Sequence, residues 1–175
     1  MTPSSASAST SAPTPAHAPT RIRNSAKAVV LHEGNVLLTR NIWNGREGHF
    51  LPGGGQEPGE LLPDTVRREV REETGLTVNV GRLLWVLEAW IRDREPVTEN
   101  YHRVEIVFLC TVDGSPDLVG GAQQDTGQIG LEWVPLDKAV TLETLSSRYR
   151  DNLAALTALT APGDSSITTA SYLEW

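Results

Sequence analysis

A short helix that carries three clustered glutamates, directly after a run of glycines, constrains this chain more than any other feature. Glycines occupy positions 53–55, and Glu69, Glu72 and Glu73 follow within one short segment. At 3.6 residues per turn, these three carboxylates lie on one side of a helix. Like charges at this spacing repel one another, so an isolated helix gains nothing from them. A divalent cation, which prefers hard oxygen ligands, would account for the cluster.

Arginines alternate with these glutamates at positions 67, 68 and 71, so a solvated face of weak ion pairs is the alternative interpretation. The spacing of the whole stretch favours the metal site. It follows the pattern G-x5-E-x7-R-E-U-x-E-E-x-G-U, where U is a bulky aliphatic residue. The fixed positions are all filled, by Gly54, Glu60, Arg68, Glu69, Val70, Glu72, Glu73, Gly75 and Leu76. The stretch from Gly54 to Leu76 therefore resembles a complete box of the Nudix hydrolase family (MutT-like).

The resemblance implies a metal site built from carboxylates and one backbone oxygen. By analogy with the family, Glu69 and Glu73 are the core ligands, and Glu72 completes the set directly or through water. The family also uses a backbone carbonyl just before the first box glycine, which falls on Gly53. Because the ligands are all oxygens, Mg²⁺ is the expected cofactor, with Mn²⁺ as an alternative.

The resemblance also implies the reaction, which is hydrolysis of a diphosphate bond by attack of water on phosphorus. Glu60 and Arg68 are expected to hold the loop and the helix together, so they serve the catalytic geometry. Some family members use a box glutamate as the general base and others use an acid from a later loop. In this chain the loop over residues 120–130 offers Asp125, which is equally well explained as an ordinary turn residue.

Four residues are candidates for binding the substrate. Arg40 and Arg46 come just before the box and supply guanidinium groups for phosphate. Glu105 lies within an apolar strand, where it is either a buried functional carboxylate or a solvent-facing one; the apolar residues around it favour burial. Trp90 is a candidate for stacking on a flat group such as a nucleobase, although aromatic residues at such positions more often only pack.

The expected substrate is a nucleoside di- or triphosphate or a nucleoside-diphosphate-linked derivative. A diphosphate without a nucleoside is a second possibility, because no subgroup pattern outside the box matches well. A catalytically inactive Nudix-like module that senses a nucleotide is a third. Such modules commonly lose box glutamates, and this chain keeps all of them.

The order of predicted elements favours an α/β (α+β) protein with the Nudix fold, an α-β-α sandwich around a mixed β-sheet. We expect a hairpin over residues 25–39, strands over 48–52, 82–91, 102–112 and 131–135, and a glycine turn at 53–55. The box helix should run from Pro63 to Gly75, with Val66 and Val70 packed on the sheet, and a terminal helix should cover 141–159. Residues 23–160 would form the domain, after a disordered tail over 1–22 rich in Ser, Thr, Ala and Pro and before an extension over 161–175.

The composition of the chain limits the kinds of partner that it could bind. The net charge of −7 argues against binding duplex nucleic acid, and no apolar run is long enough to span a membrane. The one cysteine, Cys110, should be a buried structural thiol. These features and the lack of a secretory signal favour a cytoplasmic protein with a small-molecule substrate; a homodimer is left open.

Overall fold

The computed structural model describes residues 21–43, 45–91, 101–123 and 126–159. Within these ranges seven strands form one sheet. The strands are β1 (Arg21–His32), β2 (Asn35–Trp43), β3 (Arg46–Phe50), β4 (Gly53–Gly55), β5 (Val78–Ile91), β6 (Tyr101–Val112) and β7 (Gln128–Pro135). The helices are α1 (Leu62–Thr74), α2 (Leu136–Ala139) and α3 (Ser147–Leu159).

The sheet is mixed, as predicted. Its main path runs β3-β2-β1-β6-β5, with β4 added to β1 and β7 added to β2. Strands β1 and β6 are parallel over their whole paired length, whereas the other strand pairs are antiparallel.

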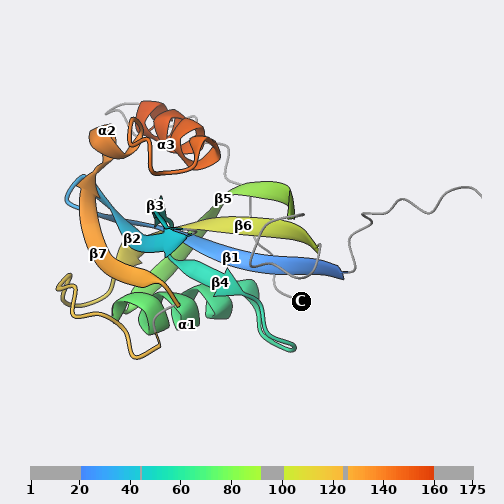
Figure 1. Ribbon diagram of the computed structural model, residues 1–175. Coiled ribbons are helices and arrows are strands. Elements are labelled where there is room, and N and C mark those ends of the chain that lie inside the picture. Colours follow the sequence, from blue (N-terminus) through green and yellow to red (C-terminus); the bar gives the residue numbers. More distant parts are fainter. Residues whose placement is uncertain (1–20, 44, 92–100, 124–125, 160–175) are drawn as a thin grey trace, which may run out of the picture.

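Helices cover both faces of the sheet, which confirms the predicted α-β-α sandwich (Figure 1). On one face Val66 and Val70 of α1 pack with Ala28, Phe108 and other small and apolar strand residues. On the opposite face Leu153 of α3 packs in a second core cluster together with strand residues such as Val107. Because side chains alternate along a strand, successive residues of β1 and β6 pack into the two core clusters on opposite faces of the sheet.

The box helix forms where the sequence predicts it. Pro63 lies in its first turn, where its missing N–H group costs no hydrogen bond. Gly75 ends the helix in the left-handed conformation (φ 79°), and its N–H group bonds the carbonyl of Arg71 at 3.0 Å. Val66 and Val70 are fully buried, so one face of α1 is anchored on the sheet.

Strands β1 and β2 separate soon after their hairpin, and this separation positions the site. The two strands pair only at Leu31–Val36 and His32–Asn35. Further along, β1 pairs with β4 through residues 25–27, while β2 pairs with β3 and β7. The glycine run 53–55 is therefore a short strand and not the predicted turn, because its backbone bonds β1 in register.

Several element ends differ from the prediction. Strand β1 already begins at Arg21, β5 at Val78 and β7 at Gln128, since sheet pairing extends each strand into polar sequence. The predicted helix over 141–159 begins only at Ser147. The preceding residues are needed elsewhere, because Leu145 inserts into the core and the Thr144 carbonyl accepts a bond from the His49 N–H group at 2.9 Å.

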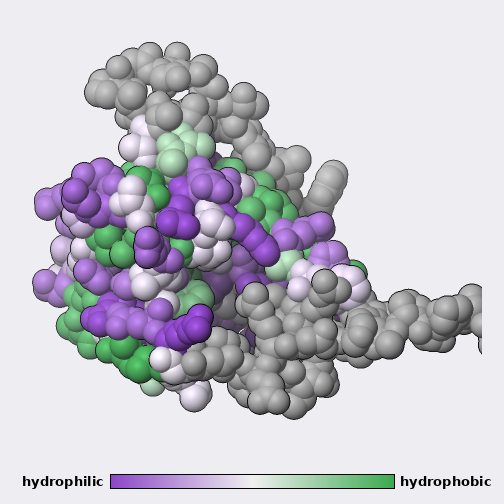
Figure 2. Space-filling model, turned by 45° about the horizontal axis from the view of Figure 1, so that its top comes forward, coloured by the Kyte–Doolittle hydropathy of each residue, from purple (hydrophilic) through white to green (hydrophobic). Residues whose placement is uncertain are grey.

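The described surface is largely hydrophilic on the face shown in Figure 2. Exposed large hydrophobic residues belong to separate elements, for example Ile22 on β1, Val86 on β5 and Val119 in a loop. None of the helices in the described ranges could cross a membrane. Cys110 is buried as predicted, and burial raises the pKa of its thiol to about 12.

Candidate active site

The glycine strand β4 fits closely between β1 and α1. Gly53 has a φ of 127°, and a Cβ atom there would lie 2.2 Å from the carbonyl oxygen of Ala26. A Cβ atom on Gly54 would lie 2.4 Å from Oε1 of Glu69. Position 53 therefore requires glycine because of its positive φ and its contact with the β1 backbone, whereas a side chain at Gly54 would displace the carboxylate of Glu69.

Glu60 and Arg68 join the loop after β4 to α1. Arg68 donates from Nε to Glu60 Oε1 at 2.9 Å and from Nη2 to Glu60 Oε2 at 3.0 Å. The same Nη2 donates to the carbonyl of Gly55 at 3.0 Å, and Thr65 donates its hydroxyl to Glu60 at 2.8 Å. The bond from Arg68 is the main cause that lowers the pKa of Glu60 to about 2. This fork of two parallel bonds is a strong arrangement, and it ties β4, the loop and the helix together.

The three box glutamates differ in their surroundings. Glu73 is only 5% exposed, and its Oε2 accepts a hydrogen bond from the Gly53 N–H group at 2.9 Å. Glu69 and Glu72 are more accessible, and both accept bonds from Nη1 of Arg68, at 2.9 and 3.1 Å. Burial raises the pKa of Glu69 above its ordinary value, while the Arg68 guanidinium opposes this shift. A cation close to Glu69 would favour its charged form further.

The oxygen atoms near β4 fit a hard divalent cation in chemistry. The donors are the carboxylates of Glu69, Glu72 and Glu73 and the carbonyl of Gly53, to which Lys27 now donates from its ammonium group. The described residues contain no ready-made group of three or more metal-ligating side chains. Instead, Lys27 donates to the Gly53 carbonyl, and Arg68 donates to the carboxylates of Glu69 and Glu72. These oxygens therefore attract positive charge, and their chemistry fits a hard divalent cation.

A cavity of about 170 Å³ lies beside these oxygens, in the cleft where β1 and β2 separate. Glu73 connects it to the box helix, and Lys27 and Arg103 supply positive charge. Its other lining residues are Thr39, Asn41, Ile42, Phe50, Leu51 and Thr126. Oδ1 of Asn41 is buried without a hydrogen-bond partner.

Glu105 lies directly behind this cavity and is 4% exposed, so of the two alternatives the buried one is correct. Arg103, which lines the cavity, approaches Glu105 Oε1 at 3.1 Å, and the Tyr149 hydroxyl donates to Glu105 Oε2 at 2.8 Å. Burial, followed by the charge of Glu105, raises the pKa of Tyr149 well above its usual range. Glu105 thus holds Arg103 in place and does not itself line the cavity.

The other candidates for substrate binding lie away from the cavity. Arg40 pairs with Glu47 of β3 at 2.7 Å, and Arg46 lies exposed on β3. Trp90 is 47% exposed near the end of β5. Among the described residues that line the cavity, none is Arg40, Arg46 or Trp90.

Asp125 lies outside the described residues, but its neighbours approach the box helix. The N–H group of Gln123 donates to the carbonyl of Glu72 at 3.1 Å. On the other side Thr126 lines the cavity. The loop that carries Asp125 is therefore attached to the end of α1 that bears the glutamates.

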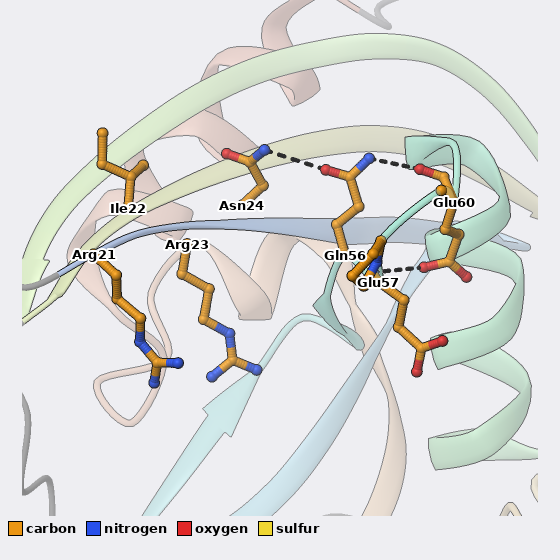
Figure 3. Close-up of a pocket in the computed structure, with 9 residues that line it drawn as sticks. Arg21, Ile22, Arg23, Asn24, Gln56, Glu57 and Glu60 are labelled. Carbon is orange, nitrogen blue, oxygen red and sulfur yellow. Dashed lines mark hydrogen bonds between the residues drawn. The ribbon is translucent and has the colours of Figure 1, made fainter.

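A larger cavity of about 630 Å³ lies between the start of β1 and the loop from Gln56 to Glu60 (Figure 3). Arg21 and Arg23 extend into it from β1 in the same direction. Asn24 donates to Gln56 at 3.2 Å, and Gln56 donates to the carbonyl of Glu60 at 2.7 Å. This chain of bonds fixes the box loop to β1. Of the two cavities, the smaller one contains a predicted metal ligand, and we assign the candidate active site to it.

Sequence reasoning missed Lys27 and Asn41. The signal for Lys27 is a lysine within the otherwise apolar run from Ala26 to Leu31. A charged residue at such a position is rarely there for packing, because burying an ammonium group requires a partner.

Fold and site together define an α-β-α domain in which a glycine strand packs against a glutamate-bearing helix. The chain belongs to the Nudix family, since the family model described as NUDIX domain matches residues 21–156.

Individual relatives agree with this assignment. An ADP-ribose pyrophosphatase of Methanocaldococcus jannaschii is 38% identical over 87 residues, which cover 49% of this chain and 48% of that protein. The chain thus spans about half the length of this relative. An RNA pyrophosphohydrolase of Teredinibacter turnerae is 29% identical over 144 residues, covering 75% of this chain and 81% of the relative. The structure of a MutT protein from Methanosarcina mazei superposes with a TM-score of 0.61 at 29% identity, over 79% of this chain and 94% of the other.

Proposed function

We propose that this protein hydrolyses a diphosphate bond in a nucleoside di- or triphosphate or in a nucleoside-diphosphate-linked compound. The observation that carries the proposal is the folded box: Glu73 binds the Gly53 N–H group and lines a cavity that also contains Lys27 and Arg103, and Lys27 donates to the Gly53 carbonyl. The printed names of two relatives, an ADP-ribose pyrophosphatase and an RNA pyrophosphohydrolase, support a nucleotide-derived substrate.

The proposed cofactor is Mg²⁺, with Mn²⁺ as an alternative, held by the three glutamates and the Gly53 carbonyl. When bound, such an ion neutralises phosphate oxygens and lowers the pKa of a coordinated water. The protein supplies the positioning. Arg68 and Glu60 keep the helix against β4, and the buried Glu73 fixes the peptide of Gly53.

The cavity side chains bind and orient the substrate in this proposal. Arg103, held by Glu105, lines the cavity and faces the phosphates in this proposal. Phe50 supplies an aromatic wall. Positioning and charge stabilisation of this kind account for much of the catalysis of phosphoryl transfer.

Two groups remain as candidates for the general base. One is a box glutamate, and the other is Asp125, whose loop is attached to α1 through Gln123. Asp125→Asn separates them. A fall in kcat of about 100-fold or more is expected for a lost general base, and a change below threefold assigns the proton to a box glutamate.

A substrate panel tests the function. Purified protein with Mg²⁺ is incubated with ADP-ribose, nucleoside triphosphates, other nucleoside-diphosphate compounds and 5′-triphosphorylated RNA, and the released phosphate and nucleotides are measured. Glu73→Gln is the matched inactive variant, because its amide oxygen can still accept the bond from Gly53. We expect turnover by the wild type and a loss of roughly a thousandfold in the variant. Turnover of none of these compounds, or equal turnover by both proteins, would overturn the proposal.

A further inference from the structure

Lys27 lies at the junction between the metal-binding oxygens and the cavity. It occupies β1 between two fully buried alanines, Ala26 and Ala28, which contact the core under α1. Because side chains alternate along a strand, Lys27 lies on the opposite side of β1 from these alanines. Its side chain lines the cavity of about 170 Å³, and its ammonium group donates to the carbonyl of Gly53.

Gly53 connects this lysine to the buried glutamate. Its carbonyl accepts from Lys27, while its N–H group donates to Glu73 at 2.9 Å. The charge of Lys27 also reaches Glu69, where it favours the ionised carboxylate. The ammonium group of Lys27 thus offsets negative charge at the Gly53 carbonyl and at the Glu69 carboxylate, which the proposed metal would also use.

Two cations cannot share these oxygens at low cost. A monovalent cation within a few ångströms of a divalent ion repels it even when the surroundings screen the two charges well. A metal ion on the Gly53 carbonyl must therefore displace the ammonium group. The four-carbon stem of lysine is flexible enough to allow that movement, and the adjoining cavity already contains Arg103.

We propose that Lys27 is a tethered counter-cation of the metal site, which holds the Gly53 carbonyl until a divalent ion displaces it into the cavity, where it binds a phosphate of the substrate. This inference rests on the proposed function, because it requires the metal and a phosphate ligand to bind at this site. It couples the two binding events, since the metal frees the group that then receives the phosphate.

The affinity for Mn²⁺ tests the first step. The chain has a single other lysine, the exposed Lys138 on α2, so Lys138→Met is a matched control for Lys27→Met. Free Mn²⁺ is measured by electron paramagnetic resonance during titration of each metal-free protein. We expect Lys27→Met to bind Mn²⁺ on the order of tenfold more tightly than the wild type, and Lys138→Met to match the wild type. Equal or weaker binding by Lys27→Met would overturn the proposal.

A second variant protects this test against a folding defect. Lys27→Gln keeps a donor for the Gly53 carbonyl but removes the charge, and it should also bind Mn²⁺ more tightly than the wild type. In the absence of metal, both Lys27 variants should melt at a lower temperature than the wild type, and saturating Mg²⁺ should remove most of this difference. A Lys27→Gln protein that binds Mn²⁺ no more tightly than the wild type would overturn the proposal.

Binding of imidodiphosphate, a pyrophosphate with a non-hydrolysable bridge, tests the second step. With saturating Mg²⁺, titration calorimetry should give about tenfold weaker binding for Lys27→Met and unchanged binding for Lys138→Met. Unchanged binding for Lys27→Met would overturn the proposal. If the wild type binds neither Mn²⁺ nor imidodiphosphate, the proposed function fails together with this inference. If the lysine effects appear but the substrate panel stays inert, the lysine assignment stands and the hydrolase assignment fails.

Discussion

Two arginine–carboxylate clusters support the candidate active site, and they are assembled in different ways. Glu60 and Arg68 are eight residues apart and meet because a loop folds back on its own helix. Glu105 and Tyr149 are 44 residues apart, and only the packing of α3 against the sheet brings them together beside Arg103. The first cluster shapes the box, whereas the second joins the cavity wall to the core. Damage to the first should therefore reduce mainly turnover, and damage to the second should reduce mainly stability.

Among changes within these two clusters, the largest effect is expected from Glu60→Gln. Without the charge of Glu60, Arg68 loses its two paired bonds to that side chain and keeps those to Glu69 and Glu72. The box loop should therefore shift relative to the helix. We expect kcat to fall about 100-fold, which corresponds to about 2.7 kcal/mol of transition-state stabilisation. Steady-state kinetics with the substrate found in the panel measures this fall.

Glu57→Gln is the control for Glu60→Gln, because Glu57 is an exposed carboxylate in the same loop. Its kcat should stay within twofold of the wild type. A comparable loss in both variants would mean that loop charge, and not the fork with Arg68, determines the rate.

The second largest effect is expected from Glu105→Gln. This change removes a buried charge that Tyr149 and Arg103 both contact. Charge-assisted bonds of this kind contribute about 1.5–3 kcal/mol, so we expect the free energy of unfolding to fall by about 2 kcal/mol. Urea denaturation measures the change. Glu88→Gln, at an exposed glutamate on β5, should change stability by less than about 0.5 kcal/mol.

A smaller effect is expected from Tyr149→Phe, which removes only the hydroxyl group of the second cluster. Glu105 keeps its ion pair with Arg103, so the cost should be about 1 kcal/mol of unfolding free energy, with kcat within a fewfold of the wild type. The same denaturation experiment measures it. A fall in kcat as large as that of Glu60→Gln would erase the distinction between the two clusters.

The smallest effect is expected in the pH dependence of the free energy of unfolding. Because Arg68 lowers the pKa of Glu60 to about 2 from an ordinary value of 4.5, the stabilisation from Glu60 is fully present above pH 4.5. It is lost progressively as the pH falls towards 2. The stability difference between the wild type and Glu60→Gln should therefore narrow when unfolding is measured at pH 6, 4 and 3. A stability difference that stays constant over this pH range would contradict the ionic character of the Glu60–Arg68 pair.

The parts of the fold that follow local rules could be predicted from the sequence. Val66 and Val70 at helical spacing predict the buried face of α1, and Gly75 marks its end. The pairing of Glu60 with Arg68 was expected from the resemblance of this stretch to the Nudix box. These features depend on residues that are near one another in the chain.

The rest depends on contacts between distant segments. The glycine run looked like a turn because nothing local indicates that Ser25 to Lys27 would pair with it. Leu145 looked helical because its insertion beside His49 is a tertiary contact. Lys27 and Arg103 face one cavity only because β1 and β6 are parallel neighbours, and no periodicity reports that pairing.

The separation of β1 from β2 has a practical consequence for finding the ligand. Most of the residues that line the cavity belong to strands of the main sheet, so unfolding of the sheet removes the cavity. A molecule that fits between these strands must therefore raise the melting temperature of the whole domain, by an amount that grows with RT ln(1 + [L]/Kd). A thermal-shift screen of a compound library with Mg²⁺ would then identify occupants of the cleft before any turnover assay has been chosen.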